Sequence, residues 1–202
     1  LTTLVQASRV FLDKSIKQII KEVLEGDGFV EGDDFEFKLK ETYEPYEYTV
    51  QYQESDFDFI SRLMEDEGIY YYISDRFLGA SADAEIKDYL VILDNKEFHP
   101  ERANDDWAGP VPYRPAQPNN PTGEGIGRFN MEHRVLPKDV LLKDYNYRKP
   151  TVEMKGTAPA EPQGYGTFYS YGDHFKTPED GNALAEVRAQ GILCRVRTWQ
   201  GH

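Results

Sequence analysis

The residues that could carry chemistry are four histidines, one cysteine and a large set of acidic side chains. The histidines, His99, His133, His174 and His202, are spaced so irregularly that no two are predicted to share one face of a helix or strand. Because a zinc site needs ligands that converge on one point, this spacing does not indicate one. Only His174 has a neighbour of interest. In the sequence Tyr-Gly-Asp-His-Phe, we expect Asp173 to cap a turn and His174 to be exposed.

Motifs for covalent, phosphate and glycosidic chemistry are also not indicated. The serines lack a G-x-S-x-G elbow, and no glycine-rich run precedes a helix. Cys194 stands among apolar and basic neighbours, so we expect a small core residue rather than a nucleophile. Asp105 and Asp106, followed by Trp107, resemble a fragment of a sugar hydrolase or of a calcium loop, but the regular oxygen spacing of a calcium loop is absent. We therefore expect no catalytic residue, no metal and no cofactor.

The elements are clearest in residues 50–73. Val50 and Tyr52 alternate with polar residues as in a strand, and Ser55 followed by Asp58 has the spacing of a helix cap. Gly68 is expected to end this helix in a left-handed conformation, and a β-branched and aromatic strand follows it. The apolar stripe of the helix, which we expect to be buried, consists of Phe57, Phe59, Ile60, Leu63 and Met64.

Two further helices are predicted from their caps. Ser15 and Thr177 are each followed three residues later by a residue that can complete a capping box. The helix after Ser15 is expected to turn Ile19 and Ile20 inward. The helix after Thr177 has only a thin apolar face, so we expect it to lie on a sheet edge.

Apolar segments outside these helices predict strands at residues 35–40, 48–52, 69–74, 89–93, 126–136, 140–148, 151–155 and 194–199. The first two alternate between apolar and polar residues, as in an antiparallel layer.

A proline-rich stretch divides the chain. We expect a first portion at residues 1–97, a linker or long loop at 98–125, and a second β-rich portion at 126–202. The opening residues 1–5 have the character of a strand and lack an initiator methionine, which we interpret as the start of a piece of a longer protein.

The composition is that of an acidic protein with enough apolar residues for a core. Of 202 residues, 39% are hydrophobic, and the net charge is −13. Such a charge repels nucleic acid and anionic membrane. No stretch approaches the roughly 20 apolar residues that span a bilayer, and no secretory signal is recognisable.

Residues 50–73 resemble the signature stretch of VgrG proteins, the trimeric spikes of type VI secretion systems, and of the related tail-hub proteins of contractile-tailed phages. Three more segments resemble the same family in the same order, at residues 11–24, 89–94 and 171–188. The resemblance implies an α+β, β-rich fold, with antiparallel barrel-like sheets of the phage tail hub type and short capped helices. The first portion would lack opening strands of its barrel.

The function implied by this resemblance is structural. The chain would be part of a trimeric hub that docks on a hexameric tube protein and supports a puncturing needle, with spike tip or effector proteins as further partners. It would be cytoplasmic before firing and then secreted through the contractile system as a virulence factor, with neither nucleic acid nor a stable membrane anchor. A phage or phage-like tail hub is the alternative, and a carbohydrate-active enzyme that uses acidic residues is the lesser one.

One charged cluster is a possible interface. Glu65, Asp66 and Glu67 crowd the C-terminal turn of the signature helix, where the helix dipole disfavours negative charge. Water and salt could compensate, or a basic patch of the tube protein or Arg62 of the next subunit could meet this acidic end. Arg62 could instead pair within its own helix with Asp58 or Asp66, each four residues away.

Overall fold

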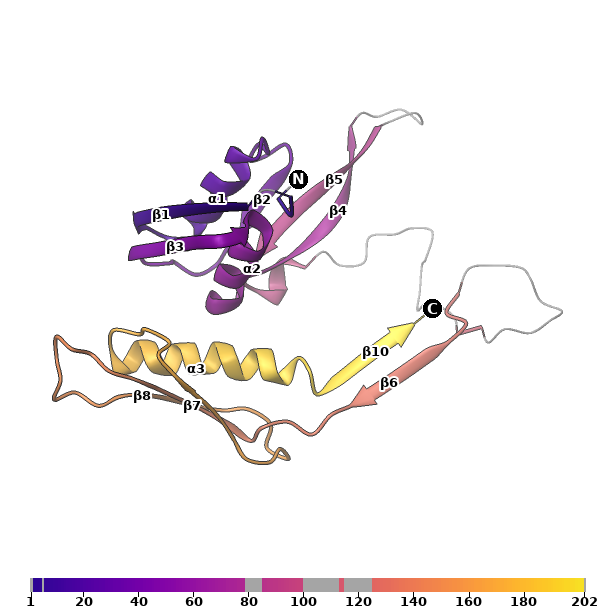
Figure 1. The fold of residues 1–202 in the computed structure, drawn as a ribbon. Coiled ribbons are helices and arrows are strands. Elements are labelled where there is room, and N and C mark those ends of the chain that lie inside the picture. The colour runs from indigo at the N-terminus through magenta and orange to yellow at the C-terminus, as the bar shows by residue number, and fades with distance from the viewer. Residues whose placement is uncertain (1, 5, 79–84, 100–112, 115–124, 202) are drawn as a thin grey trace. The chain divides into compact units, whose positions relative to one another are not determined.

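The computed structural model describes residues 2–4, 6–78, 85–99, 113–114 and 125–201. The chain forms two compact units, residues 1–99 and 100–202 (Figure 1). Most of the linker that was expected at 98–125 lies outside the described residues.

The described residues of the first unit form two α-helices and two small sheets (Figure 1). Strands β1 and β3 form an antiparallel ribbon, and a three-stranded sheet has the order β2-β5-β4. In chain order the elements are β1 (Gln6–Lys14), α1 (Ile16–Gly26), β2 (Phe35–Lys38), β3 (Tyr46–Ser55), α2 (Asp56–Glu67), β4 (Tyr70–Leu78), β5 (Glu85–Leu93) and the 3-10 turn η1 (Lys96–Phe98).

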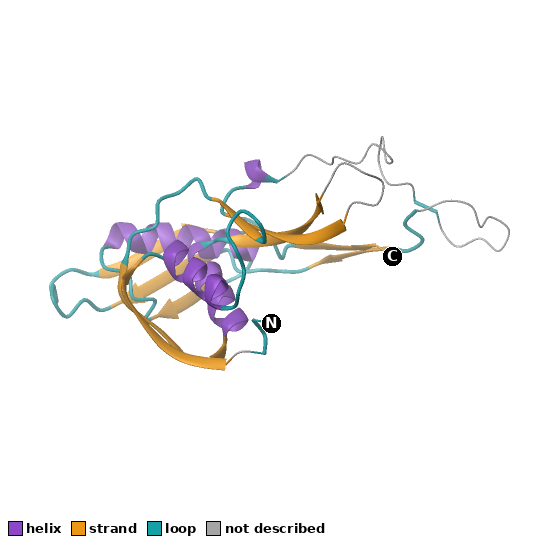
Figure 2. Ribbon diagram, turned by 90° about the horizontal axis from the view of Figure 1, so that it is seen from above, coloured by secondary structure: helices purple, strands orange, loops and turns teal. Residues whose placement is uncertain are grey.

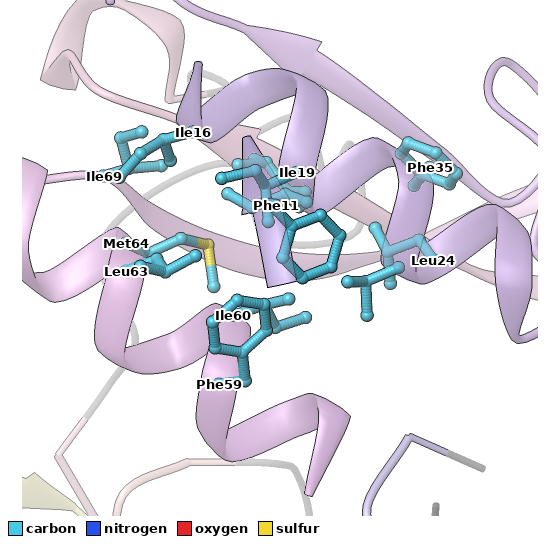
Figure 3. Close-up of a cluster of buried hydrophobic side chains, with 13 residues drawn as sticks. Phe11, Ile16, Ile19, Leu24, Phe35, Phe59, Ile60, Leu63, Met64 and Ile69 are labelled. Carbon is cyan, nitrogen blue, oxygen red and sulfur yellow. The ribbon is translucent and has the colours of Figure 1, made fainter. Parts of the chain in front are cut away.

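The core of the first unit lies between the two helices and the strands around them (Figure 3). Phe11 of β1 stacks on Phe59 of α2, with ring centroids 5.5 Å apart. Phe57 differs from the expectation, because it is only partly buried and meets Tyr71 edge-on at 6.4 Å between ring centroids. The buried helical side chains are Ile16, Ile19, Ile20, Val23 and Leu24 of α1 with Phe59, Ile60, Leu63 and Met64 of α2.

Each long helix begins at the residue that its sequence indicates. The hydroxyl oxygen of Ser55 accepts a hydrogen bond from the Asp58 backbone N–H at 3.0 Å. Ser15 and Thr177 accept the corresponding bonds as N-caps of their helices. Gly68 ends α2 with φ at 71°, the left-handed conformation that glycine adopts without a steric penalty.

The second unit has one long helix against a three-stranded sheet, together with a separate ribbon of β6 and β10 (Figure 1). Its elements are β6 (Phe129–His133), β7 (Asp139–Asp144), β8 (Met154–Pro159), β9 (Thr167–Tyr171), α3 (Pro178–Leu193) and β10 (Arg197–Gly201). Strands predominate over helices among the described residues, as a β-rich α+β fold requires (Figure 2).

The sheets are not purely antiparallel, which corrects the expectation. β2 pairs in parallel with β5, and β7 pairs in parallel with β9, a strand that the sequence did not indicate. Two parallel neighbours need a long connection, and in the sequence β3, α2 and β4 come between β2 and β5. The alternation of residues within one strand does not reveal which strand pairs with it. The described strands form sheets of two or three members, and none of these sheets closes into a barrel.

Two further expectations are wrong. Residues Thr2–Leu4 form a turn rather than a strand, and the first strand begins at Gln6; Leu1 and Val5 lie outside the described residues. Cys194 is exposed at the C-terminal end of α3 rather than buried, because the helix ends there with its side chain beyond the sheet contact. Among the described residues, no helix combines the length and the apolar character needed to cross a membrane.

Small residues allow α3 to pack closely against its sheet. The buried positions of the helix are Gly181, Ala185 and Ala189, which share one face at four-residue spacing. A Cβ atom on Gly156 of β8 would lie 2.0 Å from the carbonyl oxygen of Gly181. The helix and the strand are therefore in backbone contact, and glycine is required at this approach.

We predict that Gly156→Ala destabilises the second unit by about 1–3 kcal/mol or more, because the new methyl group overlaps backbone that cannot move freely. Gly191→Ala is the matched control, since a Cβ there meets nothing within 4 Å. In a helix interior the control should gain about 0.5–1 kcal/mol. Urea unfolding of both variants measures the difference, and equal midpoints would contradict the close approach.

Candidate functional site

The charged end of α2 is largely engaged within its own unit. Pairing of Arg62 within its own helix was one alternative; in the structure its Nη2 donates to Glu54 Oε1 at 2.6 Å and to the Val50 carbonyl oxygen at 3.0 Å. Its guanidinium carbon also lies 5.3 Å from the centre of the Phe59 ring. The salt bridge between Arg62 and Glu54 joins the helix to the end of β3. The spacing of residues along one helix cannot predict a partner on a strand.

The acidic residues at this end also have local partners. The Tyr46 hydroxyl donates a hydrogen bond to Glu67. Burial, with the hydrogen bond and charge of Glu67, raises the pKa of Tyr46. The charge of Asp66 acts on both Tyr46 and Arg62. Part of the compensation for these negative charges is thus supplied inside the unit. An interface role for Arg62, Glu65, Asp66 and Glu67 stays a prediction.

A buried polar cluster joins β1, β3 and α2. Asp56, the first residue of α2, has a side chain that is 0% exposed. Its Oδ1 accepts a hydrogen bond from Gln51 Nε2 at 2.6 Å and a salt-bridging bond from Arg9. Arg9 Nε also donates to Gln51 Oε1 at 2.8 Å. Ionised carboxylates are favoured at a helix N-terminus, so both the dipole and the cation stabilise the buried charge.

Asp27, at the C-terminal end of α1, adds a second carboxyl to this cluster. Burial, followed by the charge of Asp56, raises the pKa of Asp27, while Arg9 acts in the opposite direction. Among the described atoms, Asp27 Oδ2 and Asp56 Oδ2 are both buried without a hydrogen-bond partner. A pair of neighbouring carboxyls is found in many acid–base sites. Here, however, the Asp56 side chain is fully buried and bound to Arg9, so the arrangement joins α2 to β1 instead of facing a substrate.

Asp94 fixes the loop after β2. It follows β5 in the segment that resembles the family strand, and its carboxylate accepts from the backbone N–H groups of Lys40 and Glu41, each at 2.9 Å. The Tyr43 hydroxyl donates to it at 3.0 Å. This aspartate is therefore a structural acceptor.

Three of the four histidines and Asp173 lie in the part of the chain that the structure describes. His99 stacks between Tyr70 and Tyr72, with ring centroids 5.4 Å and 5.8 Å away. His174 is exposed with φ at 60°, and Asp173 lies 3.9 Å from Arg188. Asp105, Asp106 and His202 lie outside the described residues. Within the described ranges, no three His, Cys, Asp or Glu side chains form a group that could hold a metal.

An apolar cavity of about 390 Å³ lies in the first unit. Phe57 lines it, which accounts for the incomplete burial of this predicted core residue. Ile73 of β4 also lines it and is 65% exposed, so the cavity opens toward β4. The other apolar lining residues are Leu24, Phe29, Phe35, Ile60, Met64, Tyr71, Leu90 and Ile92.

The ribbon of β6 and β10 has no buried residue. Met131 lies opposite Trp199, so the two side chains share one face. Phe129 stacks on Trp199 with ring centroids 5.1 Å apart. An isolated two-stranded ribbon is marginally stable in water, so this apolar face is suited to being covered by other protein.

Comparison with known families matches residues 1–202 to the family described as phage tail baseplate hub (GPD). The chain is 32% identical over 187 residues to the type VI secretion system spike protein VgrG1a of Pseudomonas aeruginosa, covering 91% of this chain and 27% of that protein. It is 30% identical over 187 residues to VgrG1c of the same organism, covering 91% and 24%. The chain thus spans about a quarter of the length of these curated relatives.

One solved structure shares the fold of nearly the whole chain. The 43 kDa tail protein of prophage MuSo2 from Shewanella oneidensis matches with a TM-score of 0.53 and 15% identity, covering 95% of this chain and 50% of that one. At this identity the likeness concerns the fold alone.

We predict that Asp27→Asn stabilises the chain at neutral pH by a few degrees in Tm. Because the folded-state pKa of Asp27 is raised, its protonated form stabilises the fold at low pH, and this contribution is lost as pH rises through that pKa. Asparagine stays neutral and can donate to Asp56. The advantage should vanish below about pH 4, the ordinary Asp value.

Thermal unfolding from pH 4 to pH 8 measures this pH dependence. Asp33→Asn is the control, since it removes the same charge from an exposed turn. An Asp27→Asn variant that is less stable than the parent at pH 7 would show that the Asp27 charge is needed.

Proposed function

The chain belongs to the phage tail baseplate hub (GPD) family, and on this premise we propose that it is a structural segment of the hub of a type VI secretion spike. The observation that carries the proposal is that similarity to spike proteins named VgrG extends over 91% of the chain. A match to one short motif would be weaker support, because the same motif can occur in unrelated folds.

The proposed hub is a homotrimer that docks on a hexameric tube protein and carries spike tip or effector proteins. The ribbon of β6 and β10 supports an assembled state, because its face of Phe129, Met131 and Trp199 is exposed within its own unit. Barrel-like closure of the sheets is proposed for the assembled hub rather than for the single chain.

The segment is proposed to perform no catalysis and to bind no cofactor. The polar cluster of Arg9, Gln51 and Asp56 supports this, since its three side chains bond to one another and the Asp56 side chain is fully buried. The proposed route is cytoplasmic assembly followed by export through the contractile machine, without nucleic acid and without a stable membrane anchor.

A phage tail hub is the second candidate function. It is favoured by the fold shared with a prophage tail protein and by the description of the family itself. The two candidates differ in the particle that the hub joins, so they can be separated in the bacterium that carries the gene.

The test is deletion of the parent gene and complementation with three alleles. We expect deletion to stop release of the tube protein into the medium, the parental and Gly191→Ala alleles to restore it, and Gly156→Ala to restore it poorly. Loss of infectious particles with normal tube-protein release would instead favour the phage hub. Unchanged release and unchanged particles would contradict both candidates.

Sedimentation of the intact parent protein provides the assembly readout. We expect a mass of three protomers. A tight oligomer of any other number would contradict the proposed hub, whatever the outcome of the genetic test.

A further inference from the structure

The sheet face that lines the cavity continues along β4 and β5. In the antiparallel register, Tyr71 lies opposite Ile92, Ile73 opposite Leu90 and Asp75 opposite Asp88. Opposed residues share a face, and so do alternate residues of one strand. An apolar strip therefore runs from the cavity to a pair of aspartates, and beyond them the same face carries Ile86, which is 59% exposed.

The aspartate pair is electrostatically unfavourable in the free chain. Like charges directly opposite on neighbouring strands are destabilising, because their Cβ atoms lie about 4.5–5.5 Å apart. Asp75 and Asp88 are both exposed, and no salt bridge recorded between described residues engages either of them. Two carboxylates alone do not supply the six to eight oxygens that calcium requires. A cationic side chain is the partner that suits this pair.

The edge next to this strip is open for backbone pairing. β4 is the outer strand of the sheet β2-β5-β4 among the described strands, and it is nine residues long. An extended segment that adds to such an edge makes main-chain hydrogen bonds, and its alternate side chains give specificity. Its residues i and i+2 would stand on the cavity face about 6.7 Å apart, the same spacing as Ile73 and Asp75.

The charge of the chain is also unevenly divided. Residues 100–202 contain 13 acidic and 13 basic residues, so the whole net charge of −13 lies in residues 1–99. A basic segment is therefore attracted to the first unit over a distance as well as at the aspartate pair.

We propose that the free edge of β4 binds an extended segment of a partner protein, which places an apolar side chain at the cavity beside Ile73 and a Lys or Arg two residues away beside Asp75 and Asp88. The main chain of the segment continues the sheet, its apolar residue closes the cavity mouth, and its cation neutralises the opposed aspartates. This surface lies wholly within residues 1–99 and does not depend on the hub assignment.

The test uses three rhodamine-labelled peptides with blocked ends and the 202-residue chain, with binding followed by fluorescence anisotropy. The peptide TVTLTKT places Leu and Lys at i and i+2, TVTLTET reverses the charge, and TVTLKTT moves Lys to the opposite face. We expect the first peptide to bind at least tenfold more tightly than the other two. Its affinity should fall with added salt, since the charges are exposed.

Variants of the chain test whether Asp75 and Ile73 cause this peptide preference. Asp75→Asn should reduce the preference for Lys over Glu at least threefold, and Ile73→Thr should weaken TVTLTKT at least threefold, while the exposed control Asp33→Asn changes neither. Equal binding of the three peptides, or no binding of TVTLTKT at millimolar concentration, would overturn the proposal. Sedimentation of the free chain as a dimer that Ile73→Lys dissociates would assign the edge to a second copy and would likewise overturn it.

Discussion

The first unit depends on the burial of one ionised carboxylate, Asp56, at the start of α2. Its bonds to Arg9 and Gln51 join the helix to both strands of a ribbon that has only two members. Such a ribbon is not stable alone, so the ion pair and the adjacent contact of Phe11 with Phe59 hold it to the helical core. Loss of one partner would leave a buried charge unpaired, which typically costs about 3–5 kcal/mol.

Local physics made a large part of this fold predictable. Helix caps and 3.6-residue periodicity are encoded within a few residues, and Ser15, Ser55 and Thr177 all stand at helix N-termini. Tertiary pairing is not encoded in this way. The parallel partners of β2 and β7, the contact of Arg9 with Asp56 and the approach of Gly156 to Gly181 join residues far apart in sequence. The exposure of Phe57 and Ile73 also follows from a cavity between distant elements.

The surfaces left open in each unit are consistent with a part whose work is assembly. The first unit has an apolar cavity beside a free strand edge and carries all of the net charge. The second unit has an exposed aromatic ribbon. Arg9, Gln51 and Asp56 bond to one another inside the first unit, and the cavity and the ribbon are the apolar surfaces that remain exposed.

Hydrogen exchange in the free chain and in the assembled particle tests the central claim that this is a segment built to be covered by other protein. The amides of α1 and α2 should be protected in both states, because their core is complete. The amides of β6 and β10 that face outward should exchange quickly in the free chain and become protected on assembly. Equally fast exchange of this ribbon in the free chain and in the particle would contradict the claim.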